Sequence, residues 1–209
     1  MDPPFPSSAS APTTPANDLG FYRPARRVAL LGFLAPGAYE LWWLWQLFAF
    51  TRRERFPHAR AFWWILIPFY GLYVIYQQFD DLKKGLQGLA SPVRLSAAGA
   101  IWLFIASALA GSGGNRGTGF AALGFFVVSG LLFAAAAFIV QQGANAYQEA
   151  RYPGRQPRGM TTGEVIATVI GVIIFALSIV GAMIGGCRRC RPSASRSSLT
   201  FRLIGFLAR

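Results

Sequence analysis

Glu40 is the residue whose type and setting most directly suggest chemistry, because it is an acidic side chain well inside an apolar segment. The segment, residues 28–50, is long enough to cross a bilayer. A straight helix would place Glu40 about 18 Å from Val28, near mid-membrane, where a carboxylate can relay protons or bind a cation. A helix bent at Pro36 and Gly37 would instead leave it near the headgroups. We favour this second interpretation, because neither a histidine nor a second acid accompanies it.

Cys187 and Cys190 form a C-x-x-C pair whose two intervening arginines favour thiolate. Zinc would need two further ligands, and His58, the single histidine, lies far away in the sequence. Acylation at a membrane edge is one use of such cysteines. We interpret them as two incidental thiols.

The remaining polar patterns give no catalytic constellation. The stretch GSGGNRGTG has Arg116 where a dinucleotide-binding loop starting at Gly111 needs glycine, so we expect a flexible turn. Asp80 and Asp81, close to two lysines, are typical of a solvated helix face. We therefore expect no enzyme activity, no cofactor and no metal site.

The composition predicts a membrane protein. Of the 209 residues, 54% are hydrophobic and 13% are charged, with a mean hydropathy of +0.39, whereas soluble domains carry about 25% charged residues. The net charge is +12, and the basic residues stand in short blocks between apolar segments. This placement favours anionic lipid headgroups over nucleic acid as the partner. The candidate headgroup contacts are Arg23, Arg26, Arg27, Arg52, Arg53 and Arg55.

We expect an all-α, polytopic protein of a bacterial inner membrane. A Pro/Ser/Ala-rich tail (1–20) should be disordered, a helical membrane domain should cover 21–186, and a basic tail should follow (187–209). The domain contains about five apolar segments, at 28–50, 61–76, 95–111, 120–140 and 164–186.

The orientation depends on whether the first two segments cross. If all five cross, the basic residues divide almost evenly between the two sides. If 28–50 and 61–76 both enter and return, most basic residues gather on one side. These two segments hold five of the six tryptophans, which prefer the headgroup level, and Pro36 and Pro68 could bend them. We therefore favour a proline-bent aromatic hairpin lying shallow in the inner leaflet.

Gly181 and Gly185 form a G-x-x-x-G pair, which permits close helix approach. We expect packing within the chain, with a homo-oligomer contact as the alternative.

Residues 21 to about 185 resemble the bacterial membrane-protein family known as domain of unknown function 4234, most specifically over 21–76. The matching residues are Phe21, Tyr22 and Arg27, then Gly37 to Trp43 including Tyr39, Glu40 and Trp42, and then Phe62, Trp63, Pro68 and Phe69. Gln142 and Asn145 match a further family pattern more weakly. Members of the family often have an arginine after the Phe-Trp pair, where this chain has Trp64. The resemblance implies an integral membrane protein with no assigned activity or cofactor.

Two functions remain open. The first is a non-enzymatic protein that engages lipid headgroups or partner membrane proteins, with Tyr39, Trp42 and Trp43 beside Glu40 as candidate functional residues. The alternative is a small transporter or channel component in which Glu40 couples to a proton or cation, since broken helices line transport sites.

Overall fold

The chain is all-helical throughout the part that a computed structural model describes, residues 21–67, 69–116, 120–154 and 157–189. The predicted tails, including Cys190, lie outside these residues, as does Pro68. The all-α class is confirmed for the described ranges. The helices are α1 (Ala25–Leu34), α2 (Ala38–Arg53), the 3-10 helix η1 (Phe62–Leu66), α3 (Tyr70–Gly88), α4 (Ala97–Arg116), α5 (Phe120–Arg151) and α6 (Thr162–Arg189).

Three of the described helices are long and apolar enough to cross a membrane, over Ala97–Gly114, Phe120–Arg151 and Thr162–Gly181. The outer face of α6 carries a continuous row of exposed aliphatic side chains, among them Ile166, Val169, Ile173 and Leu177. Such a face suits lipid tails rather than water. The chain therefore has the helices of an integral membrane protein.

The segment 28–50 is two helices rather than one bent helix. Ala35 leaves the helical region (φ −130°, ψ 56°), as expected for a residue before proline, and Gly37 takes a φ of +84°, which only glycine adopts without strain. The ten residues of α1 and the sixteen of α2 correspond to about 15 and 24 Å, less than a full crossing.

The segment 61–76 is not a continuous helix either. It forms η1, an extended Ile67 before the proline, and then the first turns of α3, with Phe69 at φ +59°. The residue before a proline is driven out of the helical region, which explains the break. Phe69 is 88% exposed, and Trp63 and Leu66 are also exposed.

Two helices extend beyond the predicted apolar segments, and one of them takes in part of the glycine-rich stretch for which we expected a flexible turn. The glycine-rich stretch continues α4 to Arg116, where Gly113 and Gly114 lie against the rings of Phe125 and Phe126, so small residues let α4 and α5 approach closely. The polar stretch after residue 140 continues α5 to Arg151, because its Gln141 and Gln148 face the interior.

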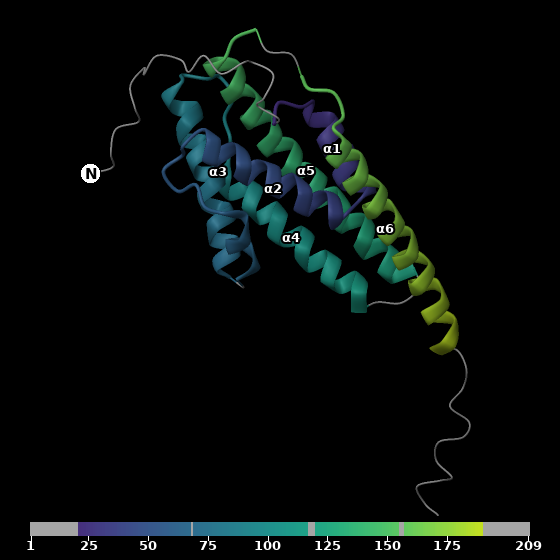
Figure 1. Ribbon diagram of the computed structural model, residues 1–209. Helices are drawn as coiled ribbons and strands as arrows, with labels where there is room; N and C mark the ends of the chain where they lie inside the picture. The colour runs from purple at the N-terminus through teal and green to yellow at the C-terminus, as the bar shows by residue number, and fades with distance from the viewer. Residues whose placement is uncertain (1–20, 68, 117–119, 155–156, 190–209) are drawn as a thin grey trace, which may run out of the picture.

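The long helix α5 is the centre of the fold, packed mainly against α4 and α1, while α2 crosses toward α6 (Figure 1). Tyr22, just before α1, bonds Glu149, and Glu54, just after α2, bonds Tyr152. Both therefore lie at the carboxyl end of α5. Because α1 and α2 start and finish at this same end, we call them the re-entrant pair.

Candidate functional site

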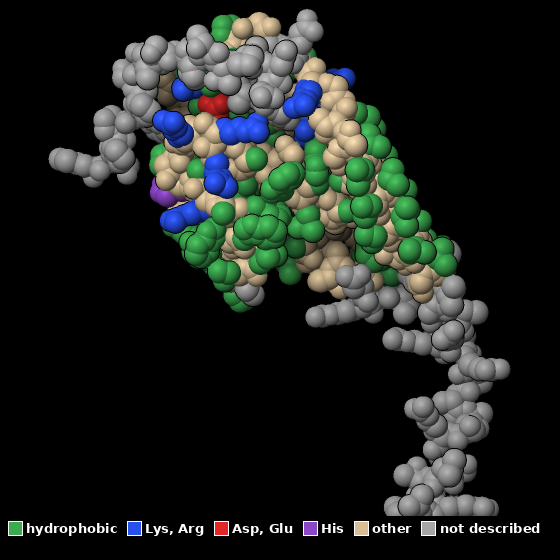
Figure 2. All heavy atoms as spheres, viewed as in Figure 1, with side chains coloured by type: hydrophobic (Ala, Val, Ile, Leu, Met, Phe, Trp, Pro, Cys, Tyr) green, Lys and Arg blue, Asp and Glu red, His purple; other side chains and the backbone are tan. Residues whose placement is uncertain are grey.

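Charged side chains gather at one end of the domain, where α1 begins, α2 and α5 end and α6 begins; we call it the charged end. Figure 2 shows basic side chains around this end and mostly hydrophobic ones toward the other. Between residues 97 and 148 the only basic residue is Arg116, at the far end of α4.

The centre of the charged end is a buried carboxylate that the sequence did not single out as a site. Glu164, 0% exposed, lies 3.3 Å from Arg27 Nε and 3.8 Å from Arg23 Nε. Its backbone N–H donates to Thr161 Oγ1 at 3.2 Å, which caps the start of α6. Two arginines from the start of the re-entrant pair are thereby joined to the start of α6.

Arg23 is inside the protein rather than at its surface, although we predicted a headgroup contact. It is 1% exposed, and its guanidinium carbon lies 4.4 Å from the centre of the Trp42 ring, a cation–π contact. Burial lowers the pKa of the Arg23 guanidinium from its usual range, and the nearby charge of Glu164 opposes that shift. Tyr39 OH donates to Glu164 Oε1 at 3.4 Å.

Two amides of α5 hold the segment that precedes α1. Gln141 accepts from Trp43 Nε1 at 3.0 Å and donates to the Phe21 carbonyl at 2.8 Å, while Asn145 donates to the Arg23 carbonyl at 2.6 Å. The amide next to Asn145 in this network is Gln141, whereas Gln142, which the family resemblance indicated, is exposed.

Asp81 is buried rather than solvated. At 1% exposure it accepts from the His58 backbone N–H and pairs with His58 Nδ1, both at 2.9 Å. Asp80 does lie at the surface, where it pairs with Lys84. Helical position separates the two, because consecutive residues point about 100° apart. The Asp81 contact fastens the loop after α2 to α3.

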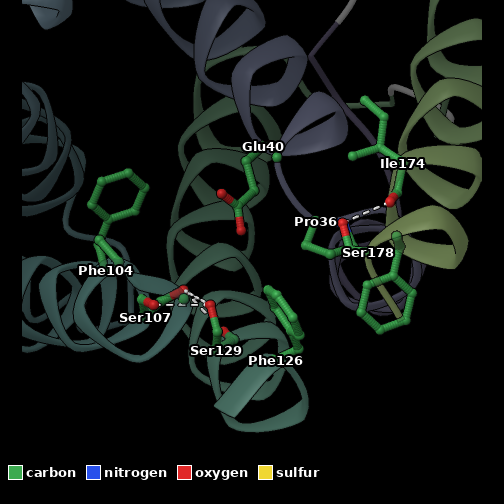
Figure 3. A pocket seen from close by; sticks show the side chains of 12 residues that line it. Pro36, Glu40, Phe104, Ser107, Phe126, Ser129, Ile174 and Ser178 are labelled. Carbon is green, nitrogen blue, oxygen red and sulfur yellow. Dashed lines mark hydrogen bonds between the residues drawn. The ribbon is translucent and has the colours of Figure 1, made fainter. Parts of the chain in front are cut away.

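Glu40 lines a pocket of about 280 Å³ between the start of α2, the first third of α5 and the middles of α4 and α6; we call it the Glu40 pocket. Figure 3 shows the carboxylate pointing into it, toward the Ser107–Ser129 pair. Ser178 lines the α6 side. Ile174 and Ser178 lie 10 and 14 residues after Glu164, about 15 and 21 Å along α6, so the pocket lies within the domain, away from the charged end. Among the described residues, no basic side chain pairs with it.

The remaining residues that the sequence suggested as functional differ in burial. Arg26, Arg52, Arg53 and Arg55 are exposed at the charged end and Arg27 is half-buried there, whereas Trp43 is buried in the core. Gly181 is exposed, and a methyl group on it would meet nothing within 4 Å, so it makes no close helix contact with the described residues. The surroundings of Gly185 and the Cys187 side chain lie outside the description.

The chain matches no protein-family model, no curated protein and no solved structure at a significant level. The function therefore has to be inferred from its own residues.

Proposed function

We propose that this integral membrane protein acts by binding, and that its charged end engages the anionic headgroups of the inner leaflet. The observation that carries the proposal is the collar of exposed basic side chains at the end from which three apolar helices extend. Its members include Arg26, Arg52, Arg53, Arg55 and Arg158. Each basic side chain near an anionic surface contributes about 1 kcal/mol of attraction.

The orientation follows from the same charges. Short loops rich in lysine and arginine stay in the cytoplasm. We therefore propose a cytoplasmic charged end in a bacterial inner membrane, and membership of the domain of unknown function 4234 family remains a proposal resting on the residues quoted above. A partner membrane protein or a second copy of the chain could cover the exposed aromatic residues around η1.

We also propose that the protein performs no bond-breaking reaction. Its single histidine is held by Asp81, and the carbonyl of His58 accepts from Gln78. In the described ranges, no group of three histidine, cysteine or acidic side chains could hold a metal ion. These contacts are structural links between the loop after α2 and α3, which supports a binding role.

Lipid selectivity tests the headgroup proposal. The protein is reconstituted in phosphatidylcholine containing spin-labelled phosphatidylglycerol, and the motionally restricted lipid is measured by electron spin resonance. We expect phosphatidylglycerol to be preferred, and high salt to weaken the preference by screening. A variant carrying Arg52→Gln, Arg53→Gln and Arg55→Gln should lose at least about fivefold in selectivity, the factor that about 1 kcal/mol from a single one of the three arginines would give.

The control removes the same charge from the other end, through Arg116→Gln, Arg188→Gln and Arg189→Gln, and should keep most of the preference. Equal association of both lipids with the unmodified protein would refute the proposal. An equal loss in the two triple variants would also count against it.

A second candidate function is proton or cation coupling through Glu40, and the Glu40 pocket favours it. Ionisable residues within a membrane domain usually face a cavity with a role in transport. Liposomes containing a proton-sensitive dye test this candidate. Flux that disappears in Glu40→Gln supports it, and flux unchanged in that variant excludes it.

A further inference from the structure

The polar side chains that line the Glu40 pocket present acceptors and no spare donor. Ser107 Oγ donates to the Ser129 carbonyl at 2.9 Å, and Ser129 Oγ donates to the Ser107 carbonyl at 2.8 Å. Ser178 Oγ donates to the Ile174 carbonyl at 2.8 Å (Figure 3). With their protons used in this way, the three hydroxyls offer only lone pairs to the pocket.

Glu40 adds a carboxyl group to this set of acceptors. It is the one titratable side chain among the described residues that line the pocket. A pocket with a carboxylate, hydroxyl lone pairs and no side-chain donor has the polarity that complements a positively charged ligand.

The walls of the pocket are aromatic. Phe104 from α4, Phe126 from α5 and Phe175 from α6 line it, and the rings of Phe126 and Phe175 meet edge to face with centres 6.4 Å apart. Aromatic rings attract organic cations, and cages of such rings recognise quaternary ammonium groups. A bare metal cation would instead prefer a close shell of six or more oxygens.

We propose that the Glu40 pocket binds a small organic cation of the alkylammonium class, with Glu40 as its counter-charge and the phenylalanine rings around its alkyl groups. The pocket volume of about 280 Å³ lies just below the roughly 300–1,000 Å³ of sites for drug-sized ligands, which suits a small ligand. The inference rests on the second candidate function, for which it names the ligand. It does not depend on headgroup binding at the other end.

Calorimetric titration of the protein in micelles of dodecyl maltoside, a detergent without an ammonium group, tests the proposal. The probes are choline chloride, its neutral isostere 3,3-dimethylbutan-1-ol, and sodium chloride as the inorganic cation. We expect choline to bind at least tenfold more tightly than the alcohol, and sodium chloride to produce no saturable heat. The titration measures binding and does not depend on flux. If the protein binds choline but transports no proton or cation, the second candidate function fails and the binding proposal stands.

Three variants locate the site. Glu40→Gln, nearly isosteric, should weaken choline binding at least tenfold, whereas Asp80→Asn on α3 should leave it unchanged. Phe126→Leu should weaken choline binding by removing an aromatic wall. Ala108→Leu should abolish binding by filling the pocket without altering charge, and Ala98→Leu, on the same helix but away from the residues that line the pocket, is its control. Thermal melting of each variant shows whether it folds.

Several results would overturn the proposal. These are the absence of choline binding, equal binding of choline and the alcohol, or saturable binding of sodium without choline. Choline binding that survives both Glu40→Gln and Ala108→Leu in folded protein would place the site elsewhere and also overturn it.

Discussion

Glu164 is the residue on which the charged end depends, because among the described residues it is the one carboxylate within ion-pairing distance of Arg23. Both side chains are almost fully buried, and Arg23 Nη1 has no hydrogen-bond partner among the described residues. A buried cation without its counter-ion keeps the full cost of leaving water. The Arg23–Glu164 pair therefore matters more for stability than any ion pair at the surface.

Glu164→Gln should consequently destabilise the protein by about 3–5 kcal/mol, the usual cost of breaking a buried pair. Thermal and denaturant unfolding in detergent measure the loss. Asp80→Asn, which breaks the exposed Asp80–Lys84 pair, should cost at most about 1 kcal/mol. Adding Arg23→Met to Glu164→Gln should recover part of the loss, and no recovery would mean that the unpaired charge is not its cause.

Tyr22 gives the charged end a dependence on alkaline pH. Its hydroxyl donates to Glu149, and this bond, with burial and the carboxylate charge, raises the pKa of Tyr22 to about 12. In the unfolded chain a tyrosine titrates near pH 10. As the pH rises from about 10 to 12, the unfolded chain loses the proton first, which favours unfolding.

The contribution of Tyr22 to stability should therefore be complete below pH 10 and decline above it. Melting temperatures at pH 9, 10 and 11 measure this decline, and Tyr22→Phe should make it shallower. Tyr76→Phe, at an exposed position on α3, is the control and should follow the unmodified protein. Parallel curves for the unmodified protein and Tyr22→Phe would contradict the assignment.

At the scale of the elements, the turn of the re-entrant pair is fixed by close contact with α6. A methyl group on Gly171 would lie 2.5 Å from Ala35 Cβ and 2.8 Å from the Ala35 carbonyl oxygen. Only a glycine at this position lets the turn approach so closely. The close helix contact expected at Gly181 lies instead at Gly171, ten residues nearer the charged end.

Gly171→Ala should thus separate α1 from α6 and cost about 1–3 kcal/mol, as overpacking does. Gly181→Ala, where a methyl group meets nothing within 4 Å, should be neutral or slightly stabilising, because alanine is the better helix former. Unfolding in detergent compares the two. Equal effects would show that the contact at Gly171 is not specific.

The sequence predicted the helices better than it predicted the contacts between their side chains. Apolar length identified α4, α5 and α6, and Pro36 and Pro68 marked where the helices stop. Which polar residues turn inward was not predictable, since it depends on segments far apart in the chain. Gln141 donates to the Phe21 carbonyl and Arg27 donates to Glu164, and each bond joins residues more than 100 positions apart. The sequence near these residues does not indicate either bond.

At the scale of the whole molecule, the re-entrant pair sets which loops share a side. Tyr22 and Glu54 flank the pair and both bond residues near the end of α5. The loop that follows α2 should therefore lie on the same side of the membrane as the loop that follows α5. The far end of α4 should lie on the opposite side, since α4 runs away from the charged end (Figure 1).

Cysteine labelling tests this sidedness in a background with Cys187→Ser and Cys190→Ser. A membrane-impermeant maleimide should react with Arg55→Cys and Gly154→Cys from the cytoplasmic side in inverted vesicles. It should react with Asn115→Cys from the other side in right-side-out vesicles. Labelling of Arg55→Cys and Gly154→Cys from the same side would support the re-entrant geometry. The side from which both are labelled tests the positive-inside orientation.

The two conclusions separate cleanly in this experiment. If Arg55→Cys and Gly154→Cys react from opposite sides, α1 and α2 together cross the membrane and the re-entrant geometry is wrong. If both react only from outside, the geometry holds but the charged end faces away from the cytoplasm, and the proposal of inner-leaflet headgroup binding fails. The Glu40 pocket survives the second result, because its position along α6 is the same in either orientation.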